Sequence, residues 1–249
     1  MNNIKHPHGN NKSFFLKLIK KFIQNIIKFF VNFLCKLDKF DEIIISSATH
    51  APWEKDVNFK NFFKKVNMFT LLDNPRAYTL WQCSKNLRNI NGCILDIGCL
   101  LGGSAFIMSK INHKNKAYLF DTFSGFKKDD GLHKKDVFYY DDIDFVKKNI
   151  KRLNLKNISV HKAYFPKNIN LKINKIKLCH LDVNTYIDTK KAFKWIEKRL
   201  IKSGIIIFDD FGIWGVDGIK KFIYEIEPKY EKKYLFIKNY MGQCILVKK

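Results

Sequence analysis

From residue 92 onward, short apolar runs rich in β-branched residues alternate with stretches of helical periodicity. The helical patterns lie near 103–112, 141–154, 188–202 and 217–227. The apolar runs are CILDIG (93–98), AYLFD (117–121), ISVHKA (158–163), IKLCHLD (176–182) and GIIIFDD (204–210). Nearly continuous apolar strands that alternate with helices are typical of a parallel sheet covered on both faces. We therefore expect an α/β fold.

The C-terminal part follows a different pattern. YLFIKN (234–239) and QCILVKK (243–249) are separated only by a short turn, which predicts an antiparallel hairpin on the sheet edge. Five parallel strands and such a hairpin resemble the Rossmann-like, seven-stranded, mostly parallel sheet of the class I methyltransferases. A chain of 249 residues is long enough for one such domain with an appendage.

Residues 13–40 place apolar side chains at helical spacing, with lysines between them. Charges interrupt every stretch long enough to cross a bilayer, so we expect no membrane span. Residues 1–40 contain eight lysines and one acid, and a basic, Phe-rich amphipathic helix can lie on an anionic membrane surface. It can equally pack on its own domain or on a second subunit of a homo-oligomer. Peripheral contact with the inner face of the membrane and self-association both stay open.

The chain is strongly basic, with 46 Lys+Arg against 23 Asp+Glu. Only Arg76, Arg88, Arg152 and Arg199 are arginines, whereas nucleic-acid surfaces favour Arg for its bidentate grip on phosphate. Codon bias explains the excess of lysine better than nucleic-acid binding does, so we expect no nucleic-acid partner. The six cysteines show no CxxC spacing, which fits reduced thiols in a cytoplasmic protein.

The turn after the first strand has the pattern of a cofactor site. Glycines at the carboxyl end of a strand let the backbone approach a ligand. The spacing acid-x-Gly-x-x-x-Gly differs from the fingerprint that cradles a dinucleotide pyrophosphate, and the cationic groups of S-adenosylmethionine favour a nearby carboxylate. The candidate residues are Asp96, Gly98, Gly102, Gly103 and Ser104.

Asp121 ends the second strand, 23 residues after Gly98, with Thr122 beside it. An acid at this point can accept hydrogen bonds from both ribose hydroxyls of the same cofactor. The alternative is a turn residue, because Asp-Thr-Phe-Ser-Gly is also good turn chemistry.

Three acids follow the fourth and fifth strands. Asp182 closes one strand, and Asp209 and Asp210 close the next. Neighbouring strands lie about 4.8 Å apart, so these carboxylates meet at one edge of the sheet. A hard cation such as Mg²⁺, which prefers oxygen ligands, would neutralise them. The competing explanation is that the three acids are separately solvated residues that end their strands and bind no cation.

Several motifs in the same order resemble the TylF-type family, the macrocin and mycinamicin sugar O-methyltransferases. The matching segments, from about residue 68 to the C-terminus, are DIGCLLGGSA, DTFSGF, AYFP, HLDVNTYIDTKKAF, IIIFDDFGIWGVDGIKKF and MGQCILVKK. The resemblance implies a metal-dependent enzyme that methylates a sugar or glycoconjugate hydroxyl, with metal ligands Asp182, Asp209 and Asp210. We expect a basic helical segment at 1–67, a methyltransferase domain at 68–249, and a surface-polysaccharide or lipid-linked acceptor if the helix binds membrane.

The sequence departs from the family at the proposed general base. Where sugar-modifying members carry a second Asp, this chain has Asn184, and an amide accepts no proton at neutral pH. A metal-bound hydroxyl would compensate in part, and His180, His161 and Asp188 are nearby proton acceptors. The catalytic candidates are thus Asp182, Asn184 and His180. Methylation of another small molecule or an RNA ribose, and a cofactor-binding protein without turnover, stay open as alternatives.

Overall fold

The computed structural model describes residues 11–38, 50–125, 138–140, 142–167, 169–213 and 216–249. It forms two compact units, Met1–Ala51 and Pro52–Lys249. The first unit contains the helix α1 (Asn11–Asp38), along which large apolar side chains such as Phe15, Phe22 and Phe33 are exposed. Within the described residues, none of the helices combines the length and the apolar character that crossing a bilayer requires.

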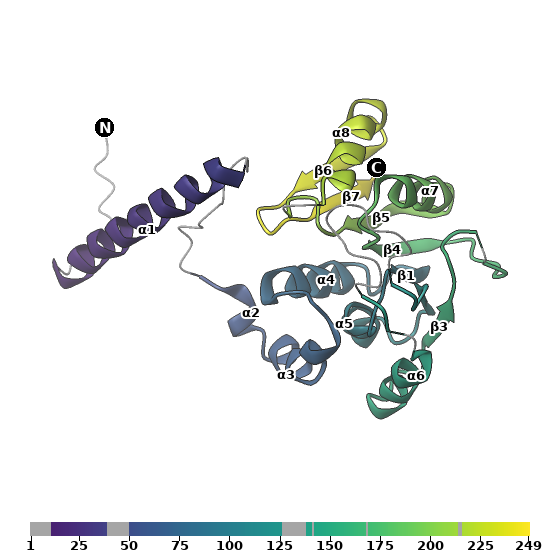
Figure 1. Ribbon diagram of the computed structural model, residues 1–249. Coiled ribbons are helices and arrows are strands. Elements are labelled where there is room, and N and C mark those ends of the chain that lie inside the picture. Colours follow the sequence, from purple (N-terminus) through teal and green to yellow (C-terminus); the bar gives the residue numbers. More distant parts are fainter. Residues whose placement is uncertain (1–10, 39–49, 126–137, 141, 168, 214–215) are drawn as a thin grey trace, which may run out of the picture. The chain divides into compact units, whose positions relative to one another are not determined.

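The second unit is built on a seven-stranded sheet with the order β3-β2-β1-β4-β5-β7-β6 (Figure 1). The first five strands run parallel, and β7 pairs antiparallel with both β5 and β6. This confirms the expected fold, including the C-terminal hairpin. The strands are β1 (Cys93–Ile97), β2 (Ala117–Asp121), β3 (Ile158–Lys162), β4 (Ile176–Leu181), β5 (Leu200–Phe208), β6 (Tyr234–Lys238) and β7 (Cys244–Lys248).

Helices cover both faces of this sheet, so apolar residues form a core on each side. On one face lie α2 (Pro52–Lys55), α3 (Val57–Val66), the 3₁₀ helix η1 (Asn67–Phe69), α4 (Asn74–Asn86), α5 (Gly103–Ile111) and α6 (Ile143–Arg152). On the other lie α7 (Tyr186–Glu197) and α8 (Asp217–Tyr230). Every residue of β4 is buried, as a central strand between two helical layers requires.

Two boundaries differ from the sequence analysis. The helix expected to reach residue 202 ends at Glu197, and β5 begins at Leu200 rather than at 204. Leu200 is buried and pairs with Ile176, and a register shift with Ser203 at φ 61° accommodates the polar residues that follow. The helices α2 and α3 fall within residues 1–67, the expected basic helical segment, and belong to the same compact unit as the sheet. Phe59 and Phe63 of α3 are buried in its core.

The chain order creates a crevice between β1 and β4. After β3 the chain returns across the sheet and adds β4 beside β1, so the connections diverge at the carboxyl ends of these two strands. Ligands bind at such a switch point in open α/β sheets. Gly98 lies here with φ +83°, and a Cβ at this position would be 1.7 Å from the carbonyl oxygen of Asp182. Only glycine permits this approach, which fixes Asp182 at the crevice.

Candidate functional site

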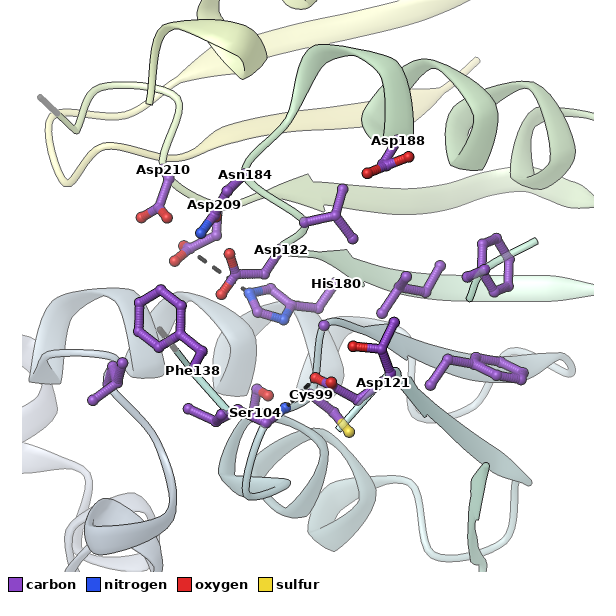
Figure 2. Close-up of a pocket in the computed structure, with 18 of the residues that line it drawn as sticks. Cys99, Ser104, Asp121, Phe138, His180, Asp182, Asn184, Asp188, Asp209 and Asp210 are labelled. Carbon is purple, nitrogen blue, oxygen red and sulfur yellow. Dashed lines mark hydrogen bonds and ion pairs between the residues drawn. The ribbon is translucent and has the colours of Figure 1, made fainter. Parts of the chain in front are cut away.

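A cavity of about 660 Å³ opens over the carboxyl ends of β1, β2, β4 and β5 (Figure 2). It combines apolar walls with a group of polar side chains, as ligand pockets do. The predicted site residues that line it are Gly98, Ser104, Asp121, Thr122, His180, Asp182, Asn184, Asp209 and Asp210. Arg76, Tyr164 and Asp188 line it as well.

Asp96 is completely buried behind this cavity. Its Oδ2 accepts a hydrogen bond from Ser104 Oγ at 2.6 Å, and its Oδ1 lies 2.8 Å from His180 Nδ1. Both carboxylate oxygens therefore have protein partners, and Asp96 orients His180.

The two glycines that follow serve helix packing. Gly102 is the N-cap of α5, with φ +88°, and a Cβ on Gly103 would lie 2.5 Å from the carbonyl oxygen of Phe69. Of the predicted glycines, Gly98 is the one that lines the cavity among the described residues.

Asp121 lies at the end of β2, where its carboxylate organises the turns on either side. Its Oδ2 accepts from the backbone N–H of Leu100 at 2.8 Å, and its Oδ1 accepts from that of Phe123 at 2.8 Å. Burial raises the pKa of Asp121 above its ordinary value, although backbone hydrogen bonds from Phe123, Leu100 and Thr122 oppose the shift. Each oxygen keeps a second lone pair for a ligand hydroxyl.

The three acids after β4 and β5 converge at the cavity, as the sequence predicted. Asp182 N–H donates to Ile97 O at 2.9 Å, and Asp209 N–H donates to Leu181 O at 3.1 Å, so both acids continue the strand pairing. Burial and the charges of Asp209 and Asp210 raise the pKa of Asp182 well above its ordinary value. A buried group of like charges requires a counter-charge.

A guanidinium supplies that counter-charge in this structure. Arg76 Nη1 on α4 lies 2.6 Å from Asp209 Oδ2 and 3.2 Å from Asp210 Oδ1. Gln243, immediately before β7, donates from Nε2 to Asp209 Oδ1 at 2.8 Å. Sequence reasoning did not find Arg76 or Gln243 as site residues, because no local motif connects them to the acids.

Asn184 lies between two of the acids, at φ 59°. With Nδ2 turned toward the carboxylates, it donates to Asp182 Oδ1 at 3.0 Å and to Asp210 Oδ2 at 3.1 Å. In this orientation the amide nitrogen and both carboxylates have hydrogen-bond partners. Asn184 therefore holds the acids in place, whereas an Asp at the same position would repel them.

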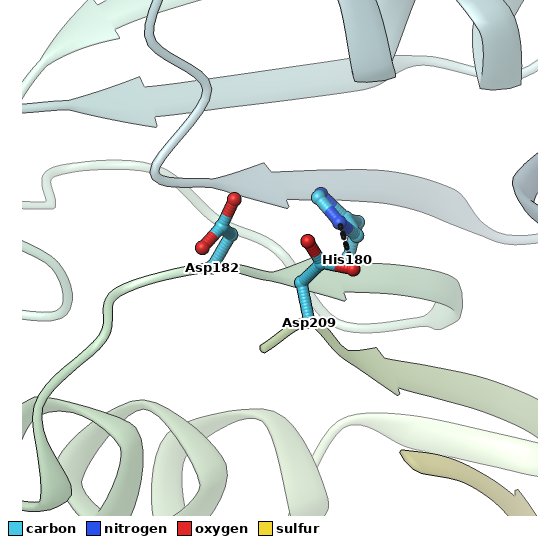
Figure 3. Close-up of side chains that lie close together, drawn as sticks. All are labelled: His180, Asp182 and Asp209. Atoms are coloured by element: carbon cyan, nitrogen blue, oxygen red, sulfur yellow. Dashed lines mark ion pairs between the residues drawn. The ribbon is translucent and has the colours of Figure 1, made fainter. Parts of the chain in front are cut away.

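His180 is the predicted proton acceptor that lies among the acids. Burial alone would lower its pKa, but the hydrogen bond that Nδ1–H donates to Asp96 and the charges of Asp96, Asp209 and Asp182 raise the pKa to about 9. Its side chain gathers with Asp182 and Asp209 at the strand ends (Figure 3), and their ligand atoms lie within 4.8 Å of one another.

The other two predicted proton acceptors lie elsewhere. Asp188, on the first turn of α7, accepts hydrogen bonds from Tyr164 Oη and from Thr185 Oγ1. Figure 2 shows Asp188 apart from the three acids. His161 lies on β3, with its ring nitrogen 2.9 Å from Ser159 Oγ.

Comparisons with known proteins agree with this geometry. The profile of the macrocin-O-methyltransferase (TylF) family matches residues 64–229. Comparison with curated proteins finds no match.

Several solved structures are similar. The O-methyltransferase NovP superposes with a TM-score of 0.64 and 18% identity, over 72% of this chain and 82% of that one. CalS11, a calicheamicin methyltransferase, superposes with a TM-score of 0.59 and 11% identity, over 82% of this chain and 99% of that one. A putative caffeoyl-CoA O-methyltransferase from Staphylococcus aureus superposes with a TM-score of 0.56 and 15% identity, over 90% of this chain and 100% of that one. These superpositions show a common fold. The family profile covers β1 to β5 and the three acids that follow β4 and β5. The chain therefore belongs to the macrocin-O-methyltransferase (TylF) family of S-adenosylmethionine-dependent O-methyltransferases.

Proposed function

We propose that the chain transfers a methyl group from S-adenosylmethionine to a hydroxyl of a sugar or glycoconjugate, with a divalent cation held by Asp182, Asp209 and Asp210. The convergence of these three carboxylates beside the cavity carries the proposal. A sugar acceptor is supported by CalS11, which is described as a TDP-rhamnose 3'-O-methyltransferase and superposes with a TM-score of 0.56, at 12% identity over 77% of this chain and 87% of that one.

The cavity suits the cofactor. Its volume of about 660 Å³ lies within the range of small-molecule pockets, roughly 300–1,000 Å³. Asp121 presents free lone pairs to a ribose at one side, and Gly98 keeps the floor of the crevice open to a ligand. The carboxylates of Asp182, Asp209 and Asp210 also line the cavity and suit the cationic end of S-adenosylmethionine.

The acids suit a divalent cation. Asp182 is half-buried and has a raised pKa, and a cation bound beside it would stabilise its ionised form. When bound, S-adenosylmethionine supplies the methyl electrophile and the cation polarises the acceptor hydroxyl. Asp182, Asp209 and Asp210 would hold that cation, and Asn184 would keep Asp182 and Asp210 in position.

A metal-binding and turnover experiment tests this function. Isothermal titration with S-adenosylmethionine, with and without divalent cation, should show cofactor uptake by wild type and by Asp182→Ala. The variant should lose cation affinity and methyl transfer to nucleotide-sugar acceptors. Cofactor uptake without transfer to any sugar, with cation present, would support a binding protein without turnover instead.

We also propose that α1 contacts the inner face of an anionic membrane, which would place the enzyme beside lipid-linked acceptors of polysaccharide synthesis. Phe22 and Ile26 are exposed and share one side of the helix, while Lys21 and Lys28 share another. Buried apolar area and attraction to anionic lipid reinforce each other in such helices.

Vesicle co-sedimentation tests the membrane contact. Full-length protein should bind vesicles that contain phosphatidylglycerol and bind neutral vesicles weakly. Phe22→Glu should abolish binding, whereas Asn25→Glu, which adds the same charge at another side of α1, should reduce it only slightly. Equal binding by both variants, or self-association without vesicle binding, would overturn this proposal.

A further inference from the structure

His180 has one ring nitrogen that the fold leaves without a hydrogen bond. Its side chain is 1% exposed, and its Nδ1 lies 2.8 Å from Asp96 Oδ1. Its Nε2 is buried and has no hydrogen-bond partner among the described residues. Leaving a buried polar atom unpaired costs about 1–3 kcal/mol, so an arrangement of this kind calls for a ligand.

The unpaired nitrogen faces the acids. Nε2 lies 4.0 Å from Asp209 Oδ1, which is too far for a hydrogen bond. The ligand atoms of His180, Asp182 and Asp209 all lie within 4.8 Å of one another. Ligands of one cation at about 2.1 Å are separated by roughly 3 Å when adjacent and by roughly 4 Å when opposite. The 4.8 Å limit is wider than the separation of opposite ligands, so the side chains must move slightly closer before the three groups can share one cation.

Strand geometry produces this convergence. His180 and Asp182 are two residues apart at the end of β4, and such residues point to the same face of a strand. Ile207 of β5 is the register partner of His180, so Asp209 follows at the level of Asp182. On the other side, Asp96 of β1 is in register with His180. The ring is thus held between an orienting acid and two facing acids.

We propose that His180 Nε2, on release of its proton to solvent, is a direct ligand of the cation, together with Asp182 and Asp209, and that the site takes a first-row transition dication such as Mn²⁺ in preference to Mg²⁺. The inference rests on the proposed function in that the acids bind a cation at all. Mg²⁺ prefers oxygen ligands and keeps its waters, whereas imidazole suits the transition metals. Asp96, bonded to Nδ1, is the outer partner that orients metal-binding histidines.

Electron paramagnetic resonance of the wild-type protein loaded with Mn²⁺ tests the ligand directly. Echo modulation from a directly coordinated imidazole ¹⁴N is the expected result. Tightly bound Mn²⁺ without that modulation would overturn the assignment of His180 while leaving the carboxylate site intact. This readout needs neither substrate nor a variant, so it stands even where a substituted protein fails to fold.

Titration of the two cations into matched variants provides the second test. His180→Gln should weaken Mn²⁺ binding by about 100-fold or more, since even outer-shell changes cost about 10–100-fold. Its Mg²⁺ affinity should change much less. His161→Gln, at a histidine bonded to Ser159 on β3, should retain both affinities.

The outcomes separate the two proposals. A wild-type protein that binds neither cation would overturn the metal-dependent function and this inference together. Binding that Asp182→Ala abolishes and His180→Gln leaves unchanged would overturn the inference alone. Equal affinity of the wild type for Mn²⁺ and Mg²⁺ would also count against it.

Discussion

Arg76 on α4 forms an ion pair with Asp209 at the end of β5, with 2.6 Å between Nη1 and Oδ2. The two residues are 133 positions apart in the chain. Arg76 Nη2 also donates to Leu71 O at 3.1 Å, which anchors the segment before α4. The cation that compensates the acids in this structure is therefore part of the fold itself.

Replacing Arg76 should destabilise the metal-free protein. Arg76→Met leaves the buried Asp209 and the half-buried Asp210 without this counter-charge, and breaking a buried ion pair such as that of Arg76 with Asp209 costs about 3–5 kcal/mol. Urea unfolding in a chelator should show this loss, and saturating divalent cation should recover part of it, because the ligand binds only the folded state. Arg88→Met, at an exposed arginine, is the control and should change stability little. Equal stability of both variants would show that Arg76 carries no such role.

Replacing Asn184 by Asp should make folding more dependent on metal. The substitution places a further carboxylate against Asp182 and Asp210, in place of amide donors at 3.0 and 3.1 Å. Repulsion between such charges costs about 1–4 kcal/mol at effective dielectric constants of roughly 80 to 20. Thermal unfolding in chelator should therefore occur at lower temperature than in wild type, and added cation should raise it by more. Asn184→Ala, which removes only the donors, should show a smaller dependence on metal. An unchanged melting temperature of Asn184→Asp in chelator would contradict this account.

A methyl group on Gly98 should disrupt the crevice. Its Cβ would lie 1.7 Å from Asp182 O, and the backbone at φ +83° disfavours any L side chain. We expect Gly98→Ala to lose at least about 1–3 kcal/mol and to lose cation affinity, because Asp182 must move. Unfolding curves and cation titration measure both effects. Gly212→Ala, whose Cβ would come no nearer than 3.1 Å to its surroundings, should cost much less. Retained cation affinity in a folded Gly98→Ala protein would refute the coupling.

His161 should contribute a pH dependence to stability. Burial lowers its pKa below the ordinary 6.5, so the unfolded chain binds more protons at acidic pH. The contribution of His161 is present above about pH 6.5 and is lost as the pH falls through the lower folded-state pKa. Urea midpoints between about pH 5 and pH 8 should fall less steeply with acid in His161→Gln than in wild type. Parallel pH profiles for the two proteins would exclude this contribution.

Lys177 should stabilise the end of the sheet opposite the cavity. It is fully buried, and its Nζ lies within hydrogen-bond distance of Leu87 O, Ile90 O, Asn112 Oδ1 and Asn115 Oδ1. Lys177→Met removes this donor from all four oxygens, and within the part of the chain that the structure describes only Leu87 O keeps another hydrogen bond, from Ile90 N–H at 3.0 Å. The cost is about 1–3 kcal/mol for each oxygen that is left unpaired and that water cannot reach. Chemical denaturation should show the loss, while cation affinity stays unchanged. A loss of cation affinity without a loss of stability would point to a different role.

Much of the fold could be predicted because most strands have a recognisable local sequence pattern. Apolar runs such as those of β4 and β5 alternate with helical patterns, and the hairpin of β6 and β7 follows from its short turn. The start of β5 was missed because Lys202 and Ser203 carry no strand signal, and pairing with β4 decides their conformation. The placement of α3 depends equally on burial of Phe59 and Phe63 against distant elements.

Some features of the candidate site could likewise be predicted from local sequence, whereas others depend on contacts between distant segments. The convergence of Asp182 with Asp209 follows from their positions at the ends of neighbouring strands. The partners of these acids do not follow from sequence, since Arg76 reaches them from α4 and Gln243 from the far end of the chain. The role of Asp96 as a partner of His180 depends on the register between β1 and β4, which no motif encodes.

The pairing of Arg76 with Asp209 across the unit has a practical consequence. Groups from α4, β1, β4, β5 and the segment before β7 must all be in place before the acids, the guanidinium and the imidazole can meet. A partly folded chain lacks that assembly. Occupancy of the site by a coloured or paramagnetic ion would thus serve as a reporter of cooperative assembly, and could sort variant libraries for intact tertiary structure without any acceptor in hand.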